Sequence, residues 1–289
     1  MFIELLKRWI KHANLGEFDL IIEPDKTTSD FIYELVKFRE LFFFMALRDI
    51  LVRYKQTVIG VAWSLIRPML SMVIFTVIFG RVAKMPTEGS VPYPIMVFSA
   101  LLPWQYFANS MSSSSESMIR GANMISKIYF PRLILPTSAV LVSAVDFFIS
   151  FGMLCVLMII YRFVPSPMII LLPIFFLIAT FTALGIGYWF SAIGIKYRDF
   201  RLLMPFIVQF GLYVSPVGFS SSVIPERWRL IYSLNPMVGV IDGFRWCIQG
   251  TADSLYLPGF IISMITSVFV FYFGMKYFQK TERFFADFI

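Results

Sequence analysis

Two charged residues lie in otherwise uncharged apolar stretches, and they are the first candidates for chemistry in this chain. Arg67 interrupts the run 57–80, and Asp146 interrupts the run 133–161. A charge at the centre of a membrane span costs about 2.5–3.5 kcal/mol on insertion scales, so such a residue normally faces a partner or an aqueous path. Two interpretations stay open: the two residues form an ion pair, or Arg67 faces a passage for an anionic group.

Residues for enzymatic chemistry are otherwise scarce. His12 is the only histidine, and Cys155 and Cys247 lie far apart in the sequence, so we expect neither a metal site nor a structural disulfide. No glycine is followed by lysine, which excludes the Gly-x4-Gly-Lys-Ser/Thr phosphate loop. We therefore expect no ATP hydrolysis and no bound cofactor in this chain. A polytopic transferase would need clustered carboxylates or a histidine at membrane depth, and the sequence offers neither.

The composition places these residues in a membrane. Of the 289 residues, 58% are hydrophobic and 15% are charged, whereas a soluble domain averages about 25% charged residues. The apolar runs exceed the roughly 20 residues that a helix needs to cross a bilayer, and they lack the alternation of barrel strands. They predict an all-α polytopic membrane protein with six transmembrane helices, at about 58–80, 93–117, 133–161, 166–195, 202–219 and 256–276. This composition excludes a soluble enzyme, a disordered chain and a disulfide-stabilised secreted domain.

The basic residues predict the orientation of the chain. With the amino terminus inside, most of the 25 Lys and Arg residues fall on the inner side, which is the usual asymmetry of membrane proteins. The net charge of +7 therefore indicates cytoplasmic segments rather than a nucleic-acid partner. Because the first residues lack the apolar core of a cleavable signal peptide, we expect a retained amino terminus and two cytoplasmic termini.

Two inner segments carry mixed apolar and charged residues. Segment 31–56 is partly amphipathic, with Arg39 and Arg53 away from its charged face, and this pattern is typical of a helix in the membrane interface. The inner loop between the second and third spans holds bulky apolar residues among basic ones, namely Ile125, Ile128, Tyr129 and Phe130. The loop is either a docking knob for another protein or a helix under the lipid headgroups, and the spacing does not separate these two interpretations.

The long outer loop between the fifth and sixth spans predicts two short helices. Pro225 and Pro236 each suit the first turn of a helix, and Asn235 is a good cap for the second one. Asp242 and Arg245 have the spacing of an ion pair on that helix. The residues expected to shape this outer region are Pro225, Trp228, Asn235, Pro236, Asp242 and Arg245.

Aromatic residues accumulate on three spans. Phe206, Phe210 and Tyr213 recur at i, i+4 and i+7, which places them on one face of the fifth span. Further candidates on the first and second spans are Trp63, Phe75, Trp104, Tyr106 and Phe107. Because aromatic rings offer flat, amphipathic contact, such residues together with Arg67 could line a passage for glycan. For any single ring, contact with lipid or with another helix is the simpler interpretation.

Several sequence strings match a known family. RDILVRYKQTVIGVAWSLIRP at 48–68 and FTVIFGR at 75–81 closely resemble the membrane subunit of ABC-2 type polysaccharide exporters. SKIYFPR at 126–132, Asn235 with Pro236, and the segment 243–245 fit the same pattern. The similarity runs from about Ile21 through the sixth span. Within this group the chain looks most like an O-antigen permease, with capsule and teichoic acid exporters as close relatives.

The resemblance implies a homodimer of six-span subunits in the bacterial cytoplasmic (inner) membrane, working with two copies of a separate ATPase that binds ATP and Mg²⁺. This assembly would export a lipid-linked polysaccharide. The resemblance also implies a cytoplasmic part, 1–56, with the interfacial helix, and a six-span domain, 57–289. Within the domain, external gate helices would occupy about 222–250, and a cytoplasmic tail would occupy 277–289.

The resemblance assigns roles to the loops and spans as well. The inner loop becomes a coupling helix on the ATPase, with the residues Asn123, Ile125, Lys127, Ile128, Tyr129 and Phe130. The first and fifth spans would line the channel, which favours the interpretation of Arg67 as a residue that faces the conduit. An ion-coupled secondary transporter is the remaining alternative, although Asp146 alone is a thin basis for ion coupling.

Overall fold

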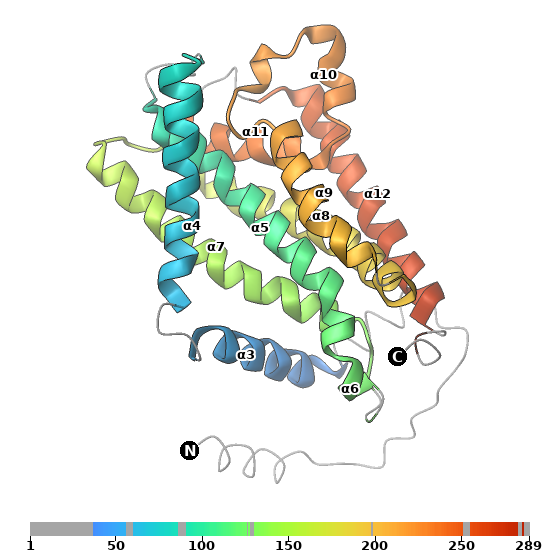
Figure 1. Cartoon of the computed structure of the whole chain (residues 1–289). Coiled ribbons are helices and arrows are strands. Elements are labelled where there is room, and N and C mark those ends of the chain that lie inside the picture. Colours follow the sequence, from blue (N-terminus) through green and yellow to red (C-terminus); the bar gives the residue numbers. More distant parts are fainter. Residues whose placement is uncertain are drawn as a thin grey trace.

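The computed structural model describes residues 37–55, 60–85, 91–125, 127, 130–197, 199–250, 255–282 and 285. Every regular element within these ranges is a helix (Figure 1), in agreement with the all-α prediction. The predictions for residues 1–36 and 56–59, and those for Ile128 and Tyr129, lie outside the described residues.

Four helical stretches are long and apolar enough to cross a membrane, and they fall on the predicted first, third, fourth and sixth spans. The first is α4 (Gly60–Phe75), which continues as the π-helical turn η1 (Thr76–Val82). The third and sixth are α7 (Ile134–Ile160) and α12 (Leu257–Glu282), and the fourth combines η2 (Pro167–Leu171) with α8 (Leu172–Lys196).

The predicted second and fifth spans differ from these four. Helix α5 (Tyr93–Arg120) has 28 residues, or about 42 Å at a rise of 1.5 Å per residue, but serines in its second half lower its hydropathy. Helix α9 (Phe200–Val214) has 15 residues and is shorter than predicted. It ends because Ser215, which is extended, precedes Pro216, and the residue before a proline avoids the helical conformation.

Helix α5 forms the centre of the bundle, where it packs against α7, α8 and α11 (Pro236–Gln249) (Figure 1). Helices α8 and α12 approach each other closely because both carry glycine at the crossing. A Cβ atom on Gly185 would lie 2.6 Å from the Cα of Phe271, and one on Gly274 would meet the carbonyl oxygen of Gly185. Small residues at such crossings let membrane helices gain van der Waals contact along their backbones.

The two ends of the bundle carry the remaining helices. Helix α3 (Arg39–Lys55) lies across one end of the bundle, and the short α6 (Ala122–Ile125) lies at the same end (Figure 1). The opposite end carries η3 (Ser221–Val223) and α10 (Glu226–Tyr232). Helices α10 and α11 confirm the two short helices predicted in the outer loop. Asn235 caps α11 as predicted, since its Oδ1 accepts a hydrogen bond of 3.0 Å from the backbone nitrogen of Met237.

Candidate functional site

A cavity of about 690 Å³ lies among α3, α4, α5, α7 and α9. Four residues predicted for the substrate path line it, namely Trp63, Arg67, Trp104 and Tyr106. Its polar walls also include the amide side chains of Gln105, Asn109 and Gln209, which the sequence analysis did not single out. Amides at scattered positions give no periodic signal, so only the fold could bring them together.

Arg67 does not pair with Asp146, so the ion-pair interpretation is wrong. The acid is instead held from α3 and from another residue of α4. Oδ2 of Asp146 lies 2.7 Å from Nη2 of Arg53, and its Oδ1 accepts hydrogen bonds of 2.6 Å from the hydroxyls of Tyr54 and Ser64. The physical reason is that α3 passes beneath α7 and presents two donors where the acid points. We call Arg53, Tyr54, Ser64 and Asp146 the acid node.

Arg67 itself is exposed at the cavity. Its guanidinium carbon lies 5.8 Å from the centre of the Trp63 ring, a separation at which a cation is attracted to the ring face. Among the described residues, Arg67 takes part in no ion pair. The cavity wall therefore presents a positive charge beside an aromatic ring.

The charges of the acid node are unequally exposed. The Asp146 side chain is 9% exposed, whereas that of Arg53 is 41% exposed. A buried carboxylate is costly unless it is paired and hydrogen-bonded, and three donors satisfy that requirement here. Burial, together with the hydrogen bond to Asp146, raises the pKa of Tyr54 to about 12, so its hydroxyl remains a donor at neutral pH.

A second cavity, of about 450 Å³, is lined mainly by apolar residues. It brings together four of the predicted aromatic residues, namely Trp104, Phe107, Phe206 and Phe210. Trp104 lines both cavities and therefore stands between the polar one and the apolar one. Phe75 and Tyr213 are not among the lining residues of these two cavities: Phe75 stacks on Phe79, and the Tyr213 hydroxyl accepts a hydrogen bond from Gln209.

Near the outer end, buried polar groups hold residues 215–222, which we call the outer strap. Arg245 is fully buried, and its guanidinium donates hydrogen bonds of 2.8 and 3.0 Å to the carbonyl oxygens of Phe219 and Val217. Asp242, predicted to pair with Arg245, accepts a hydrogen bond of 2.8 Å from Ser221. Pro225, the residue that precedes α10, and Trp228, within α10, are both exposed.

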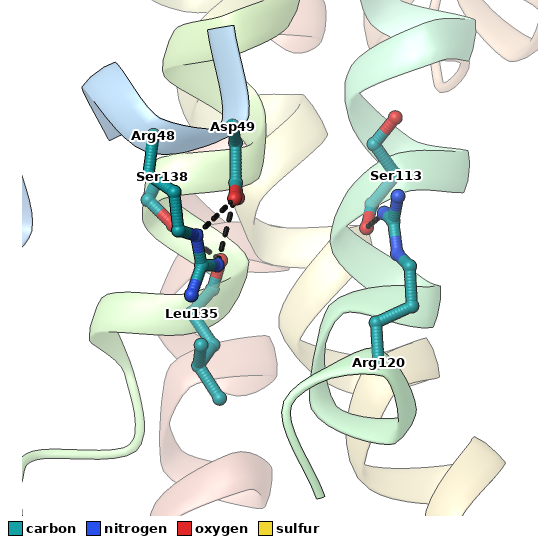
Figure 2. Close-up of polar contacts among 6 residues, drawn as sticks. All are labelled: Arg48, Asp49, Ser113, Arg120, Leu135 and Ser138. Atoms are coloured by element: carbon teal, nitrogen blue, oxygen red, sulfur yellow. Dashed lines mark hydrogen bonds and ion pairs between the residues drawn. The ribbon is translucent and has the colours of Figure 1, made fainter. Parts of the chain in front are cut away.

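At the inner end, α6 carries Asn123 and Ile125, and Lys127 follows as an exposed residue. Phe130 differs from them because it is 4% exposed and belongs to the hydrophobic core. Figure 2 shows this end of the bundle. There, Arg48 and Asp49 of α3 form an exposed ion pair of 2.7 Å beside the first turns of α7. Arg120, at the end of α5, donates a hydrogen bond of 2.8 Å to the carbonyl oxygen of Ser113.

The sequence profile of the ABC-2 type transporter family matches residues 40–249. The match covers most of the chain and includes every element that lines the two cavities except α12. The chain therefore belongs to the ABC-2 type transporter family. It is a multi-pass membrane permease subunit, these 289 residues contain no nucleotide-binding ATPase domain, and a permease of this kind works with an ATPase subunit.

Curated relatives point to one group within the family. The chain is 28% identical over 248 residues to an O-antigen export system permease protein RfbA of Klebsiella pneumoniae, covering 83% of this chain and 91% of that protein. It is 26% identical over 216 residues to the protein of the same name in Myxococcus xanthus, covering 74% of this chain and 82% of that protein. These matches agree with the resemblance found in the sequence strings.

Proposed function

We propose that this chain is the permease of a bacterial exporter that moves lipid-linked polysaccharide across the cytoplasmic membrane, O-antigen being the first candidate. The observation that carries the proposal is the polar cavity, which is lined by Arg67 and Trp63 together with the amides of Gln105, Asn109 and Gln209. Aromatic faces and amides suit sugar rings, and a guanidinium suits a phosphate or acidic sugar. The names of the relatives support the same class of cargo. Capsular polysaccharide and teichoic acid offer related chemistry and are the alternatives.

The proposed path uses six spans, with α5 as the second and α9 as the fifth. The α9 face that carries Phe206, Phe210 and Tyr213 is exposed on the single subunit, and so are much of α4 and its Trp63. A second copy of the chain that faces these helices would complete a channel between the subunits. The proposed channel wall comprises Trp63, Arg67, Phe75, Trp104, Tyr106, Phe107, Phe206, Phe210 and Tyr213.

The inner end is proposed to dock on the separate ATPase, where ATP and Mg²⁺ would bind. The contact would involve α6 and the loop after it, with Asn123 and Lys127 offering exposed polar groups. The outer helices α10 and α11 would form the external gate, whose residues are Pro225, Trp228, Asn235, Pro236, Asp242 and Arg245. In this arrangement, 1–56 is the cytoplasmic part and 57–289 is the transmembrane domain.

The experiment is export into inside-out vesicles that contain the permease and its co-expressed ATPase. Labelled lipid-linked glycan is added outside, and the measured quantity is the glycan protected from an added glycosidase after ATP addition. We expect Arg67→Ala to lower the amount of protected glycan and Arg67→Lys to retain part of it. Lysine keeps the positive charge but lacks the planar guanidinium with its paired N–H donors. The matched control is Arg81→Ala, which removes an exposed arginine of η1 outside the cavity.

Three outcomes would contradict the proposal in part or as a whole. Normal export by a folded Arg67→Ala protein would remove the role of Arg67. Failure of the ATPase to co-purify in mild detergent, or glycan movement that stops when ionophores collapse ion gradients while ATP remains, would favour the ion-coupled transporter instead. Comparing O-antigen, capsular and teichoic acid substrates in the same vesicles identifies the cargo.

A further inference from the structure

We propose that Asp146 is a positioning residue that holds the interfacial helix α3 and the inner half of the channel-side helix α4 together on α7, so that the inner half of α4 and α3 keep a fixed arrangement during transport. This inference rests on the proposed function, because it takes α4 as part of the channel wall. It adds a fixed mechanical connection between an inner helix and the wall of the polar cavity.

The first observation is the convergence of three elements on one carboxylate. Arg53 and Tyr54 reach it from α3, and Ser64 reaches it from α4, at 2.7, 2.6 and 2.6 Å. The acid itself belongs to α7 and lies 92 residues from Tyr54 in sequence and 82 from Ser64. One turn further along α7, Ser150 donates a hydrogen bond of 3.3 Å to the carbonyl oxygen of Ser64. Ser64 is thus held to α7 by both its side chain and its backbone.

The second observation is that α4 is much less buried within the subunit than α7. In the most apolar part of Ala62–Val82, 17% of the residues are buried, whereas the share is 50% in the corresponding part of Ile134–Ile160, the stretch that carries the acid. On α3, the buried residues are Met45 and Ala46, two turns before the acid node. Helix α7 therefore belongs to the rigid core, while α3 and the inner half of α4 are attached at its side. The acid node is the polar attachment that these two helices share.

Asp146 borders the polar cavity, but its side chain is only 9% exposed. A mostly buried carboxylate that loses its partners regains little solvation, and breaking such an ion pair from one side is strongly destabilising. If α3 moved while α4 stayed, Asp146 would lose Arg53 and Tyr54 and keep only Ser64. The lowest-energy displacement keeps all three contacts on the carboxylate of α7. The node therefore favours movement of α3, the inner half of α4 and the Asp146 segment of α7 as one unit over sliding of one helix past another.

The geometry argues against Asp146 as an ion-binding acid. One oxygen already accepts two hydroxyl hydrogen bonds, and the other contacts a guanidinium. An ion-coupled transporter needs an acid that exchanges a proton or a cation, whereas this carboxylate already holds two hydroxyls through Oδ1 and a guanidinium through Oδ2. A positioning role uses all three contacts, and an ion-binding role would have to break them.

The experiment uses the full transporter, with its ATPase, in vesicles. Asp146→Asn keeps an acceptor for Tyr54 and Ser64 and loses the ion pair, whereas Asp146→Leu removes both kinds of contact. The matched control is Asp49→Asn, which removes the exposed Arg48–Asp49 ion pair of the same helix. Three quantities are measured: ATP hydrolysis, glycan exported per ATP, and the distance between spin labels at Leu47→Cys on α3 and Ile66→Cys on the inner half of α4. Both positions are exposed, and the native cysteines are replaced.

We expect the label distance in the unmodified transporter to stay narrow with and without a non-hydrolysable ATP analogue. In Asp146→Leu it should broaden, and glycan exported per ATP should fall about tenfold, within the usual range of coupling between sites. ATP hydrolysis should continue, Asp146→Asn should be intermediate, and Asp49→Asn should match the unmodified protein. If Asp146→Leu does not fold, Arg53→Met and Tyr54→Phe remove the α3 donors one at a time and give the same readouts.

The inference is overturned if export per ATP and the label distance are unchanged in Asp146→Leu, or in the combined Arg53→Met and Tyr54→Phe protein. It is also overturned if these variants lose export and ATP hydrolysis in proportion, since that result indicates general structural damage. Failure of the proposed function gives a different result, because the unmodified transporter would then move no glycan at all.

Discussion

Nη2 of Arg245 donates a hydrogen bond of 3.0 Å to the carbonyl oxygen of Val217, across 28 residues of sequence and within the buried interior. Nη1 of the same guanidinium reaches the carbonyl oxygen of Phe219 at 2.8 Å, and the Tyr93 hydroxyl reaches the intervening Gly218 at 2.7 Å. Three consecutive carbonyl oxygens of the outer strap are thus held by side chains from α11 and α5. The strap joins the end of α9 to the outer helices, so Arg245 holds the segment between the end of α9 and the start of those helices.

Replacing Arg245 with methionine should destabilise the protein strongly. The change leaves two buried carbonyl oxygens without donors and also removes a charge from beside Asp242. Each hydrogen bond to a charged group contributes about 1.5–3 kcal/mol, so we expect a loss of about 3–5 kcal/mol in the free energy of unfolding, as for other broken buried charges. Arg245→Lys should recover only part of it, because an ammonium cannot bind two carbonyls as a fork.

Thermal unfolding of the purified protein in detergent measures this effect. The control is Arg227→Ala, since Arg227 is exposed and its guanidinium carbon lies 5.9 Å from the centre of the neighbouring Trp228 ring. Equal melting temperatures for Arg245→Met and Arg227→Ala would contradict the role given to the buried guanidinium.

The crossing of α8 and α12 gives a second prediction. A methyl group on Gly185 would lie 2.6 Å from backbone atoms of Phe271, and the backbone of a packed helix cannot move away as a side chain can. Gly185→Ala should therefore push the two helices apart and lower the free energy of unfolding by about 1–3 kcal/mol. Gly152→Ala is the matched control, because a Cβ there meets nothing within 4 Å and alanine favours a helix by about 1 kcal/mol. In the same thermal assay, the melting temperature of Gly185→Ala should lie below that of the unmodified protein, and that of Gly152→Ala should lie above it.

The elements of this fold were largely predictable from local sequence. Uncharged apolar runs identified the helices of spanning length, and Pro225, Asn235 and Pro236 identified α10 and α11 to within a residue or so. Local signals sufficed because hydropathy and capping act over one or two turns. The end of α9 was placed too late, since the apolar run continues past Ser215 while the helix does not.

The partners of the charged residues were not predictable in this way. Arg67 and Asp146 lie at a similar depth in their predicted spans, which made an ion pair between them reasonable. Depth along the membrane does not determine which helices are neighbours or which faces they turn to each other. Arg53 carried a signal of another kind, because it departs from the charged face of α3 and proves to be the residue that contacts Asp146. A charged residue that lies off the charged face of an amphipathic helix is thus a candidate to pair with a buried residue. Only the three-dimensional arrangement identifies that partner.

The raised pKa of Tyr54 gives a prediction for alkaline pH. Because its pKa is raised by burial and by Asp146 from 10 to about 12, the folded protein holds this proton more tightly than the unfolded chain does. The contribution of Tyr54 to stability is then fully present below pH 10 and is lost as the pH rises toward 12. Thermal unfolding of the unmodified protein should therefore show a steeper loss between pH 10 and 12 than that of Tyr54→Phe. Identical profiles would show that the proton of Tyr54 does not contribute to stability.

Variants of the inner loop can lose export for two different reasons, namely reduced stability of the fold or weaker docking on the ATPase. Phe130 is 4% exposed within the hydrophobic core, so Phe130→Ala should lower the free energy of unfolding by about 3–5 kcal/mol, as for other buried phenylalanines. Lys127 is exposed, and Lys127→Ala should leave the melting temperature unchanged. If the loop docks on the ATPase, Lys127→Ala should instead weaken retention of that subunit during purification in mild detergent. Retention that falls in Phe130→Ala only in proportion to unfolded protein, and does not fall in Lys127→Ala, would place the docking surface elsewhere on the inner end.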